Sequence, residues 1–461
     1  MSELAASSLR RTTHEVTNQA VALEDVNLFE SDVALGEALE REGGGWAIDR
    51  VGETGAVAGS AEAIDHGRRA ERHEPCLATH DRFGNRVDTV EYDPSWHWLL
   101  RGAIEREIHS LPWRDPRPGA HVARAALAFL WTQPNAGVMC PVSMTYSAIP
   151  ALRRNPGLAA EWVPRLIRPD YEAGALAGMA MTEKQGGSDV RANRTHAHPT
   201  GDGFFEIVGH KWFCSHPTAT VFLVLAQAPG GLSCFVVERG PGFEIQRLKE
   251  KLGSRSLASS EVELRGVPGR LLGEEGRGVA SIIDMVTHTR LDCIIGSAAS
   301  MRRGVAEAVN HARHRAAFGS WLVDQPLMTN VLADLALESE AATASALRLA
   351  RAYDESDGAL RRFGTAVMKY WICKRATPHA AEALECNGRQ RLRRGGPDGP
   401  AAARCTAQRD LGGLGERHGT GRPAGDGKRA GGAFRLHGRM RACPRGRSRT
   451  GRPPGCPRGR T

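Results

Sequence analysis

One segment of the sequence carries residue types that could bind a ligand. It reads GMAMTEKQGGSDVRANRTHA over residues 178–197, and in it Thr182 and Ser188 flank the flexible pair Gly186–Gly187. Such a loop can offer hydroxyls and backbone N–H groups to an anion or to a carbonyl-bearing molecule. Taken by itself, the segment is interpreted at least as well as an ordinary loop between a helix and a strand.

Two pairs of histidines have spacings that could place them near a metal ion. His311 and His314 are separated as on one face of a helix, and His196 and His198 alternate as on one face of a strand. Neither pair has a carboxylate or a third histidine beside it in the sequence, so solvated faces are the better interpretation and no metal site is predicted. The G-x-S-x-G, P-loop and Rossmann signatures are also absent from the sequence.

The elements that must position the loop change type twice along the chain. Apolar residues recur at three- and four-residue spacing from about residue 25 to 166, which predicts helices. Short β-rich runs such as FFEIVGHKWFCS, separated by turn signals such as PTGDG, predict a compact antiparallel β domain. Long amphipathic patterns then return. We expect an α+β fold, with an N-terminal helical domain (1–175), a middle β domain (176–275), an incomplete C-terminal helical bundle (276–385) and a disordered tail (386–461).

The formal net charge of +9 comes from the end of the 461-residue chain. Residues 1–385 hold 42 Lys and Arg against 48 Asp and Glu, whereas residues 386–461 hold 19 against 4. Gly and Pro supply 25 of those last 76 residues, which leaves too few aliphatic side chains to bury a core. The ten cysteines form no C-x-x-C pair, and no signal-peptide-like or membrane-spanning run is present, so we expect a cytoplasmic protein.

The loop and five further segments, in order, resemble the acyl-CoA dehydrogenase family, and the variant TEKQGGSD at 182–189 resembles its AidB branch. The five segments are GHKWFCS (209–215), AQAPGGLSCF (226–235), KLGSRSLASSEVE (251–263), TRLDCIIGS (289–297) and QPLM (325–328). Together they cover roughly residues 27–386. Six ordered matches are far more specific than any one of them.

The resemblance implies an FAD cofactor whose flavin is lined by the loop. Thr182 would hydrogen-bond the pyrimidine edge of the flavin, Ser188 would lie near the pyrophosphate, and an apolar wall would keep water from the ring. The implied cofactor contacts are Met179, Ala180, Met181, Thr182, Glu183, Lys184, Gln185, Gly186, Gly187, Ser188, Phe213, Cys214, Ser215, Arg315 and Phe318. Of these, Phe213, Cys214 and Ser215 would cover the ring from the facing strand.

The last two implied contacts belong to the segment RHRAAFGSWLVDQ. It resembles the part of the family fold that reaches the FAD of a neighbouring subunit, where Arg315 would pair with phosphate and Phe318 would pack on the adenine side. The resemblance therefore implies a homo-oligomer, a tetramer in the family. A basic helix end solvated at the surface is the alternative interpretation.

The family reaction removes a proton α to a thioester carbonyl, and it needs a carboxylate base. In a minority of members that base sits on a helix, at a position that here holds Thr289. In most members it follows an aromatic residue in an Ile-(Tyr/Trp)-Glu-Gly motif, which is absent as written. The resemblance places that glutamate at Gly412, so no catalytic residue is assigned.

The C-terminal sequence is consistent with a change of reading frame. RDLGGLGERHGTG (409–421) can be encoded by bases that, read one position along, give Ile-Trp-Glu-Gly-Ser-Gly-Asn-Val-Met-Ala-Leu, the motif that the family would have there. RQRLRRGGP (389–397) likewise conceals the family's glycine-rich turn. We interpret residues after about Gly388 as frameshifted, whether by mutation or by sequencing error.

Two classes of function follow. The first is an AidB-like, FAD-dependent acyl-CoA dehydrogenase, acting on an acyl-CoA thioester in its intact form and inactive in this form. The alternative is a DNA-binding or protective flavoprotein of the alkylation response without turnover. The resemblance links AidB-like members to DNA through a basic helical C-terminal domain that this chain lacks. An Arg-Gly tail can also bind nucleic acid as an electrostatic arm, but the tail holds one aromatic residue, Phe434, for base stacking.

Overall fold

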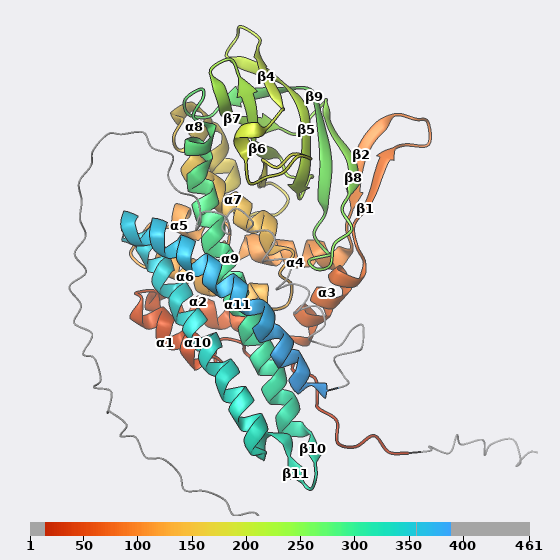
Figure 1. Cartoon of the computed structure of the whole chain (residues 1–461), viewed down its shortest axis with the longest axis vertical. Coiled ribbons are helices and arrows are strands. Elements are labelled where there is room, and N and C mark those ends of the chain that lie inside the picture. Colours follow the sequence, from red (N-terminus) through yellow and green to blue (C-terminus); the bar gives the residue numbers. More distant parts are fainter. Residues whose placement is uncertain (1–13, 356, 389–461) are drawn as a thin grey trace, which may run out of the picture. The chain divides into compact units, whose positions relative to one another are not determined.

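The computed structural model describes residues 14–355 and 357–388 (Figure 1). Helices come first, strands follow, and helices return, so the predicted α+β fold class is confirmed. The residues interpreted as frameshifted, including Gly412, lie outside the described part of the chain. Within that part, no helix combines the length and the hydropathy that a bilayer span requires.

The N-terminal helices form the first layer of the fold. They are α1 (Val33–Arg41), α2 (Ile48–Ala58), α3 (Ala61–Arg72), α4 (Pro94–Glu105), α5 (Leu111–Arg114), α6 (Ala120–Thr132), α7 (Met139–Leu152) and α8 (Pro156–Leu166), with a 3-10 turn at Gly45–Ala47. The local sequence determines where several of these helices begin. Asp93 caps α4 by accepting a hydrogen bond from the Ser95 N–H at 2.8 Å, and Pro94 supplies the first helical residue.

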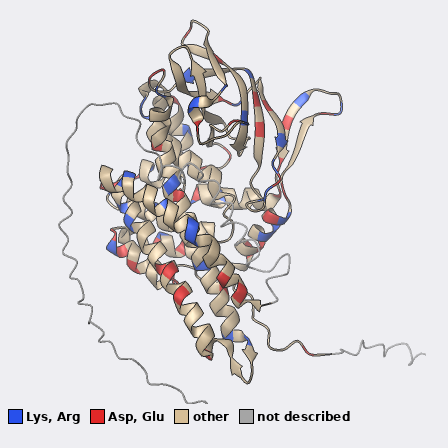
Figure 2. Ribbon diagram, viewed as in Figure 1, with Lys and Arg blue, Asp and Glu red and all other residues tan. Residues whose placement is uncertain are grey.

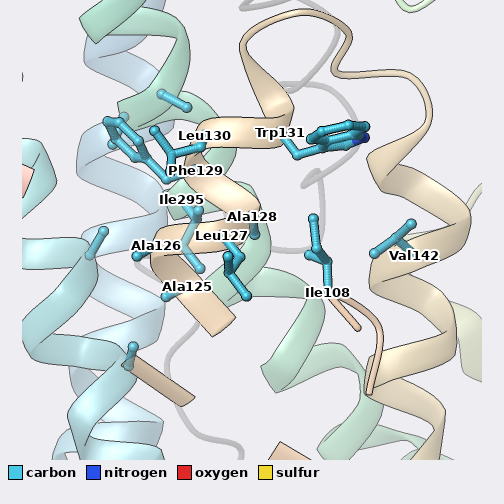
Figure 3. Close-up of a cluster of buried hydrophobic side chains, with 14 of the residues drawn as sticks. Ile108, Ala125, Ala126, Leu127, Ala128, Phe129, Leu130, Trp131, Val142 and Ile295 are labelled. Atoms are coloured by element: carbon cyan, nitrogen blue, oxygen red, sulfur yellow. The ribbon is translucent and has the colours of Figure 1, made fainter. Parts of the chain in front are cut away.

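Helix α6 is the centre of the helical core. Every residue from Ala120 to Thr132 is buried, as expected for a mainly apolar helix, and the buried set includes the polar His121 and the charged Arg124. Phe129, Leu130 and Trp131 pack there with Ile108, with Val142 of α7 and with Ile295 of a later helix (Figure 3). The N-terminal and C-terminal helices therefore share one core.

A β-hairpin interrupts the N-terminal helices, and the helical pattern did not predict it. It consists of β1 (Cys76–His80) and β2 (Arg86–Glu91). The Asp81 carboxylate closes the turn by accepting the N–H groups of Phe83 at 2.8 Å and Asn85 at 2.9 Å. Arg86 also donates to the Ile245 carbonyl at 2.8 Å, which docks the hairpin on the β domain.

The β domain contains β3 (Ala177–Ala180), β4 (His196–Pro199), β5 (Phe204–Ser215), β6 (Val221–Ala228), β7 (Gly231–Glu238), β8 (Phe243–Leu248) and β9 (Ser259–Leu271), with a 3-10 turn at Val190–Ala192. The strand order is β3-β6-β4-β5-β9-β7, β8 pairs with β9, and a further β6–β7 pairing closes the strands on themselves. Most pairs are antiparallel, as predicted. The exceptions are β3 and β4, which run parallel to β6, so the sheet is mixed.

The C-terminal helices are α9 (Gly278–His314), α10 (Pro326–Asp354) and α11 (Thr365–Cys386). A small hairpin, β10 (Ala316–Ala317) and β11 (Ser320–Trp321), and a 3-10 turn at Leu322–Asp324 connect the first two, and a π turn at Leu360–Gly364 precedes α11. The 37 residues of α9 span about 55 Å. This helix begins beside β7, packs on α6, α7, α10 and α11, and ends at the small hairpin (Figure 1).

The charges of the described residues are mixed in sign. Lys and Arg alternate with Asp and Glu along the helices and strands (Figure 2). Many of them pair, for example Arg375 of α11 with Glu338 of α10 at 2.5 Å. In the described part of the chain, basic and acidic side chains are therefore interspersed in this view (Figure 2).

Candidate functional site

The candidate ligand loop follows β3 directly and lies against β5. The Trp212 N–H of β5 donates to the Thr182 carbonyl at 2.8 Å, so the backbone fixes Thr182 beside this strand. Asn193 holds the start of the loop from its far side by donating from Nδ2 to the Met181 carbonyl at 2.8 Å. The loop is thus fastened where its predicted ligand contacts begin.

The glycine pair shapes the loop around the Thr182 side chain. Gly186 has φ +137°, in a region that other residues rarely adopt. A larger residue does not fit at Gly187, because a Cβ added there would lie 2.4 Å from Thr182 Oγ1. The two glycines are therefore needed for different reasons, one for backbone conformation and the other for close approach.

Beneath the loop lies an ion pair that is completely buried. Lys211 Nζ of β5 is 2.9 Å from Glu183 Oε1, and neither side chain has any exposed surface. Glu183 also accepts hydrogen bonds from Gln185, Arg194 and Thr195. Burial alone would raise the pKa of the Glu183 carboxyl, but Lys211 and these donors lower it to about 2. The carboxylate is held within the protein and does not face a ligand.

Strand β5 supplies the facing wall, and a register shift between Lys211 and Cys214 interrupts the alternation of its side chains. Phe213 is 46% exposed and Ser215 is half-buried. Cys214 points into the core of the β domain, where burial raises the pKa of its thiol to about 12. Only the backbone of Cys214 can meet a ligand there. Ala180 is likewise a core residue.

The Thr182 and Ser188 hydroxyls have no hydrogen-bond partner among the described residues. Thr182 is half-buried and Ser188 is exposed. Lys184 and Gly186 are also exposed, and Met179 and Met181 are partly buried against the neighbouring core. Hydroxyls, a glycine turn and an exposed aromatic ring are residue types that could hold a flat group that accepts hydrogen bonds at its edge. Their chemistry is compatible with a flavin.

The two remaining predicted contacts lie at the far end of α9, away from the loop in the same chain. Arg315 follows the helix and donates to the Asn18 carbonyl at 2.6 Å. Phe318 is fully exposed at the turn between β10 and β11, with φ +54°, next to Gly319 at φ +80°. The structure does not bring these residues together with Thr182 within one chain, and their contact with a neighbouring subunit's cofactor stays a prediction.

The structure also describes Thr289, the helix position at which some family members carry the catalytic base. Thr289 lies on α9, and its hydroxyl donates to the Val286 carbonyl at 3.0 Å. An alcohol occupied in this way cannot take a proton as a carboxylate would. Nor does any group of three or more His, Cys, Asp or Glu side chains within the described ranges form a metal site. His196 and His198 instead stack on each other on β4, at 6.1 Å between ring centroids.

Lys211 is the residue whose role the motif analysis missed. It lies within GHKWFCS, one of the segments that resemble the family, and Glu183 lies within the loop motif. A lysine at an inward-facing position of a β-strand is the signal in the sequence that indicates a buried ion pair. A buried ammonium requires a nearby carboxylate or several hydrogen-bond acceptors.

The fold consists of a helical layer, a closed β domain and a second helical layer, and a glycine-turn loop lies against strand β5 of the β domain. This is the architecture of the flavin-dependent acyl-CoA dehydrogenases. Three family models match in order: the adaptive response protein AidB N-terminal domain over residues 18–173, the acyl-CoA dehydrogenase middle domain over 178–267 and the acyl-CoA dehydrogenase C-terminal domain over 276–417. AidB of Escherichia coli is 44% identical over 397 residues, which are 82% of this chain and 73% of that protein. The chain belongs to the acyl-CoA dehydrogenase family, in its AidB branch.

Other relatives agree with this assignment. Acyl-CoA dehydrogenase family member 11 of Caenorhabditis elegans is 32% identical over 71% of this chain and 58% of its own length. The solved structure of C. elegans ACDH-11 in complex with C11-CoA has a TM-score of 0.81 at 28% identity, covering 87% of this chain and 74% of that one. A glutaryl-CoA dehydrogenase from Mycobacterium smegmatis in complex with FADH2 shares the fold, with a TM-score of 0.62 at 21% identity over 70% of this chain and 84% of that one. FAD is the cofactor of this family.

Replacing Gly187 with alanine tests the predicted contact of the loop with FAD directly. The new Cβ would collide with Thr182 Oγ1, so Thr182 must shift and the affinity for FAD should fall about 10-fold. Quenching of FAD fluorescence during titration of cofactor-free protein measures the change. Gly240→Ala is the matched control, because a Cβ at that glycine meets nothing within 4 Å. Equal affinities for the two variants would show that the loop does not contact FAD.

Proposed function

We propose that this chain is an FAD-binding protein whose site was shaped for an acyl-CoA thioester but which has little or no dehydrogenase turnover in this form. Dehydrogenation with FAD is the general activity of the family. The observation that carries the proposal is the backbone hydrogen bond from Trp212 to Thr182, which holds the loop against the part of β5 that contains the exposed Phe213. It supports a site in which the Thr182 hydroxyl and the Phe213 ring serve the same flavin.

The chain's own side chains have separate tasks in this proposal. Thr182 donates to the edge of the cofactor, Ser188 lies towards its phosphates, and Phe213 excludes water from one side. When bound, FAD would accept the hydride that leaves the β carbon of the substrate. The matching removal of the α proton needs a carboxylate, and Thr289 on α9 does not provide one. The other family position falls on Gly412, outside the described residues.

The substrate class comes from a relative. C. elegans ACDH-11 was solved in complex with C11-CoA, and we propose a fatty acyl-CoA as the thioester that this site accommodates. We also propose that a second copy of the chain completes each FAD site through Arg315 and Phe318. The full exposure of Phe318 supports this, because the ring is free to pack against a second copy of the chain and would bury apolar surface there.

Turnover is tested with purified protein, octanoyl-CoA or lauroyl-CoA and an artificial electron acceptor. We expect a flavin absorbance spectrum and no acceptor reduction above background. Measurable reduction would contradict the absence of a base. Restoring the reading frame after about codon 388 is the matched control, since it would return the glutamate and should create activity. An unbroken frame on resequencing codons 380–395 would contradict the frameshift.

The alternative is a flavoprotein of the alkylation response that binds or protects DNA without turnover. The match to the adaptive response protein AidB N-terminal domain favours a relationship to that group. DNA affinity that falls steeply with salt, and that disappears when residues 386–461 are deleted, would support binding through the tail. A flavin spectrum without DNA affinity would leave the dehydrogenase-type site as the chain's ligand site.

A further inference from the structure

The Glu183–Lys211 pair connects three separate parts of the β domain. Glu183 belongs to the loop, and Lys211 belongs to β5. The Lys211 ammonium also donates to the Leu225 carbonyl of β6 at 2.7 Å. A movement of the loop away from the strands would therefore separate buried opposite charges, which is costly in a medium of low polarity.

The carboxylate also gathers the two ends of the loop. It accepts Gln185 Nε2 at 2.8 Å near the loop's start, and the N–H groups of Arg194 at 2.6 Å and Thr195 at 3.1 Å near its end. The Thr195 hydroxyl donates to it at 2.7 Å as well. A neutral apolar side chain would fill the same space but would leave these donors unsatisfied, so the carboxylate determines the course of the backbone.

We propose that Glu183 and Lys211 are positioning residues, which hold residues 182–188 in their FAD-binding arrangement before FAD arrives. The proposal rests on the proposed function, in which these residues line the cofactor. Its physical basis is preorganisation: a loop that is already ordered loses less conformational entropy on binding, so more of the contact energy appears as affinity. Neither side chain touches the ligand, because both are completely buried.

The test uses the full chain with the double substitution Glu183→Gln/Lys211→Met, which removes both charges at similar volume. We expect the Kd for FAD, measured by fluorescence quenching, to rise about 10-fold or more. In FAD-free protein, amide hydrogen exchange over residues 182–195 should be faster than in the wild type. Glu183→Asp keeps the charge but shortens the side chain by one methylene, and it should give intermediate values. It also provides a readout if the double variant fails to fold.

The matched control removes a buried ion pair elsewhere. Arg303 and Glu307 are paired one turn apart on α9, are nearly buried and do not contact the loop. Arg303→Met/Glu307→Gln should lower the melting temperature without changing the Kd for FAD or the exchange of residues 182–195. A loss of FAD affinity in both double variants would assign the effect to general destabilisation and overturn the proposal.

Hydrogen exchange separates this inference from the proposed function. If the wild type binds no FAD, the proposed cofactor site is wrong, yet exchange in the FAD-free protein still reports on the loop. Faster exchange over residues 182–195 in the Glu183→Gln/Lys211→Met variant alone supports the positioning role. Unchanged exchange, or a Kd within about twofold of the wild type, overturns it.

Discussion

When the pH is lowered from about 7 to about 5, three buried histidines together are expected to remove about 5–6 kcal/mol from the free energy of unfolding, and Asp354 is expected to return about 1 kcal/mol of it. His121, whose pKa burial also lowers, acts in the same direction as these three histidines. Burial lowers the pKa of His109 to about 4, of His216 to about 3 and of His288 to about 4. The unfolded chain binds protons at these positions below about pH 6.5, while the folded chain does not, so stability falls as the pH decreases through this range.

The surroundings explain why these imidazoles stay neutral. His288 lies on α9 among the rings of Trp113, Tyr146 and Tyr353, and its Nδ1 bonds the Asp284 carbonyl at 2.8 Å. His109 bonds the Arg168 carbonyl at 3.2 Å. No carboxylate bonds either ring within the described residues, so a proton gained there would remain uncompensated in a buried place.

Buried carboxyls with raised pKa values limit the size of the effect. Burial raises the pKa of Asp354 to about 6, and it also raises the pKa of Asp32 and Glu307, so these groups stabilise the fold as the pH falls. Glu183 works in the opposite sense, but with its pKa held at about 2 its contribution is lost only below about pH 4.5. Between about pH 7 and 5, Asp354 therefore offsets only part of the loss caused by the histidines, and Glu183 has no effect.

Urea unfolding at several pH values measures the prediction. His288→Phe keeps an aromatic ring in the cluster and removes the titrating group, so the stability lost between about pH 7 and 5 should shrink by about 2 kcal/mol. His198→Gln is the control, because His198 is exposed on β4, and it should leave the loss unchanged. An identical pH dependence for the wild type and His288→Phe would contradict the argument.

Regular patterns allowed the fold order to be predicted from the sequence. The alternation in FFEIVGHKWFCS correctly predicted β5, and the apolar repeat after residue 277 correctly predicted α9. The hairpin at residues 76–91 was missed because its strands are short and mostly exposed, so they carry little hydrophobic alternation. Its stability comes from the Asp81 turn and from docking on Ile245, a contact 159 residues away.

For the candidate site, too, the sequence predicted some features and missed others. The motif at 178–197 singled out the loop, but the close approach of Gly187 to Thr182 became apparent only in the structure. The direction of individual side chains was not available from the motif, since Glu183 turns inward to Lys211 and Cys214 turns into the core. Such directions depend on strand register and on partners that are distant in sequence, which a local pattern does not contain.

Replacing Asp292 with asparagine is expected to cost about 3–5 kcal/mol of stability. Asp292 on α9 pairs with Arg124 on α6, where Nη2 and Oδ2 are 2.9 Å apart, and the Arg124 side chain is 1% exposed. Arg124 also donates from Nε to the Ile108 carbonyl at 2.8 Å and lies 3.9 Å from the Tyr146 ring centroid. The pair joins the N-terminal helices to α9, and the substitution leaves the guanidinium buried without its counter-charge.

The double variant Arg124→Met/Asp292→Leu separates loss of the pair from exposure of an uncompensated charge. It removes both charges and fills the space with apolar atoms, so most of the stability should return. The remaining deficit should be about 1–3 kcal/mol, because the Ile108 carbonyl loses its donor. Glu172→Gln is the control: it breaks an exposed pair with Arg101, 73% and 42% exposed respectively, and should leave the stability nearly unchanged. If the double variant were as unstable as Asp292→Asn, the cost would lie in the lost contacts themselves and not in a buried, unpaired Arg124.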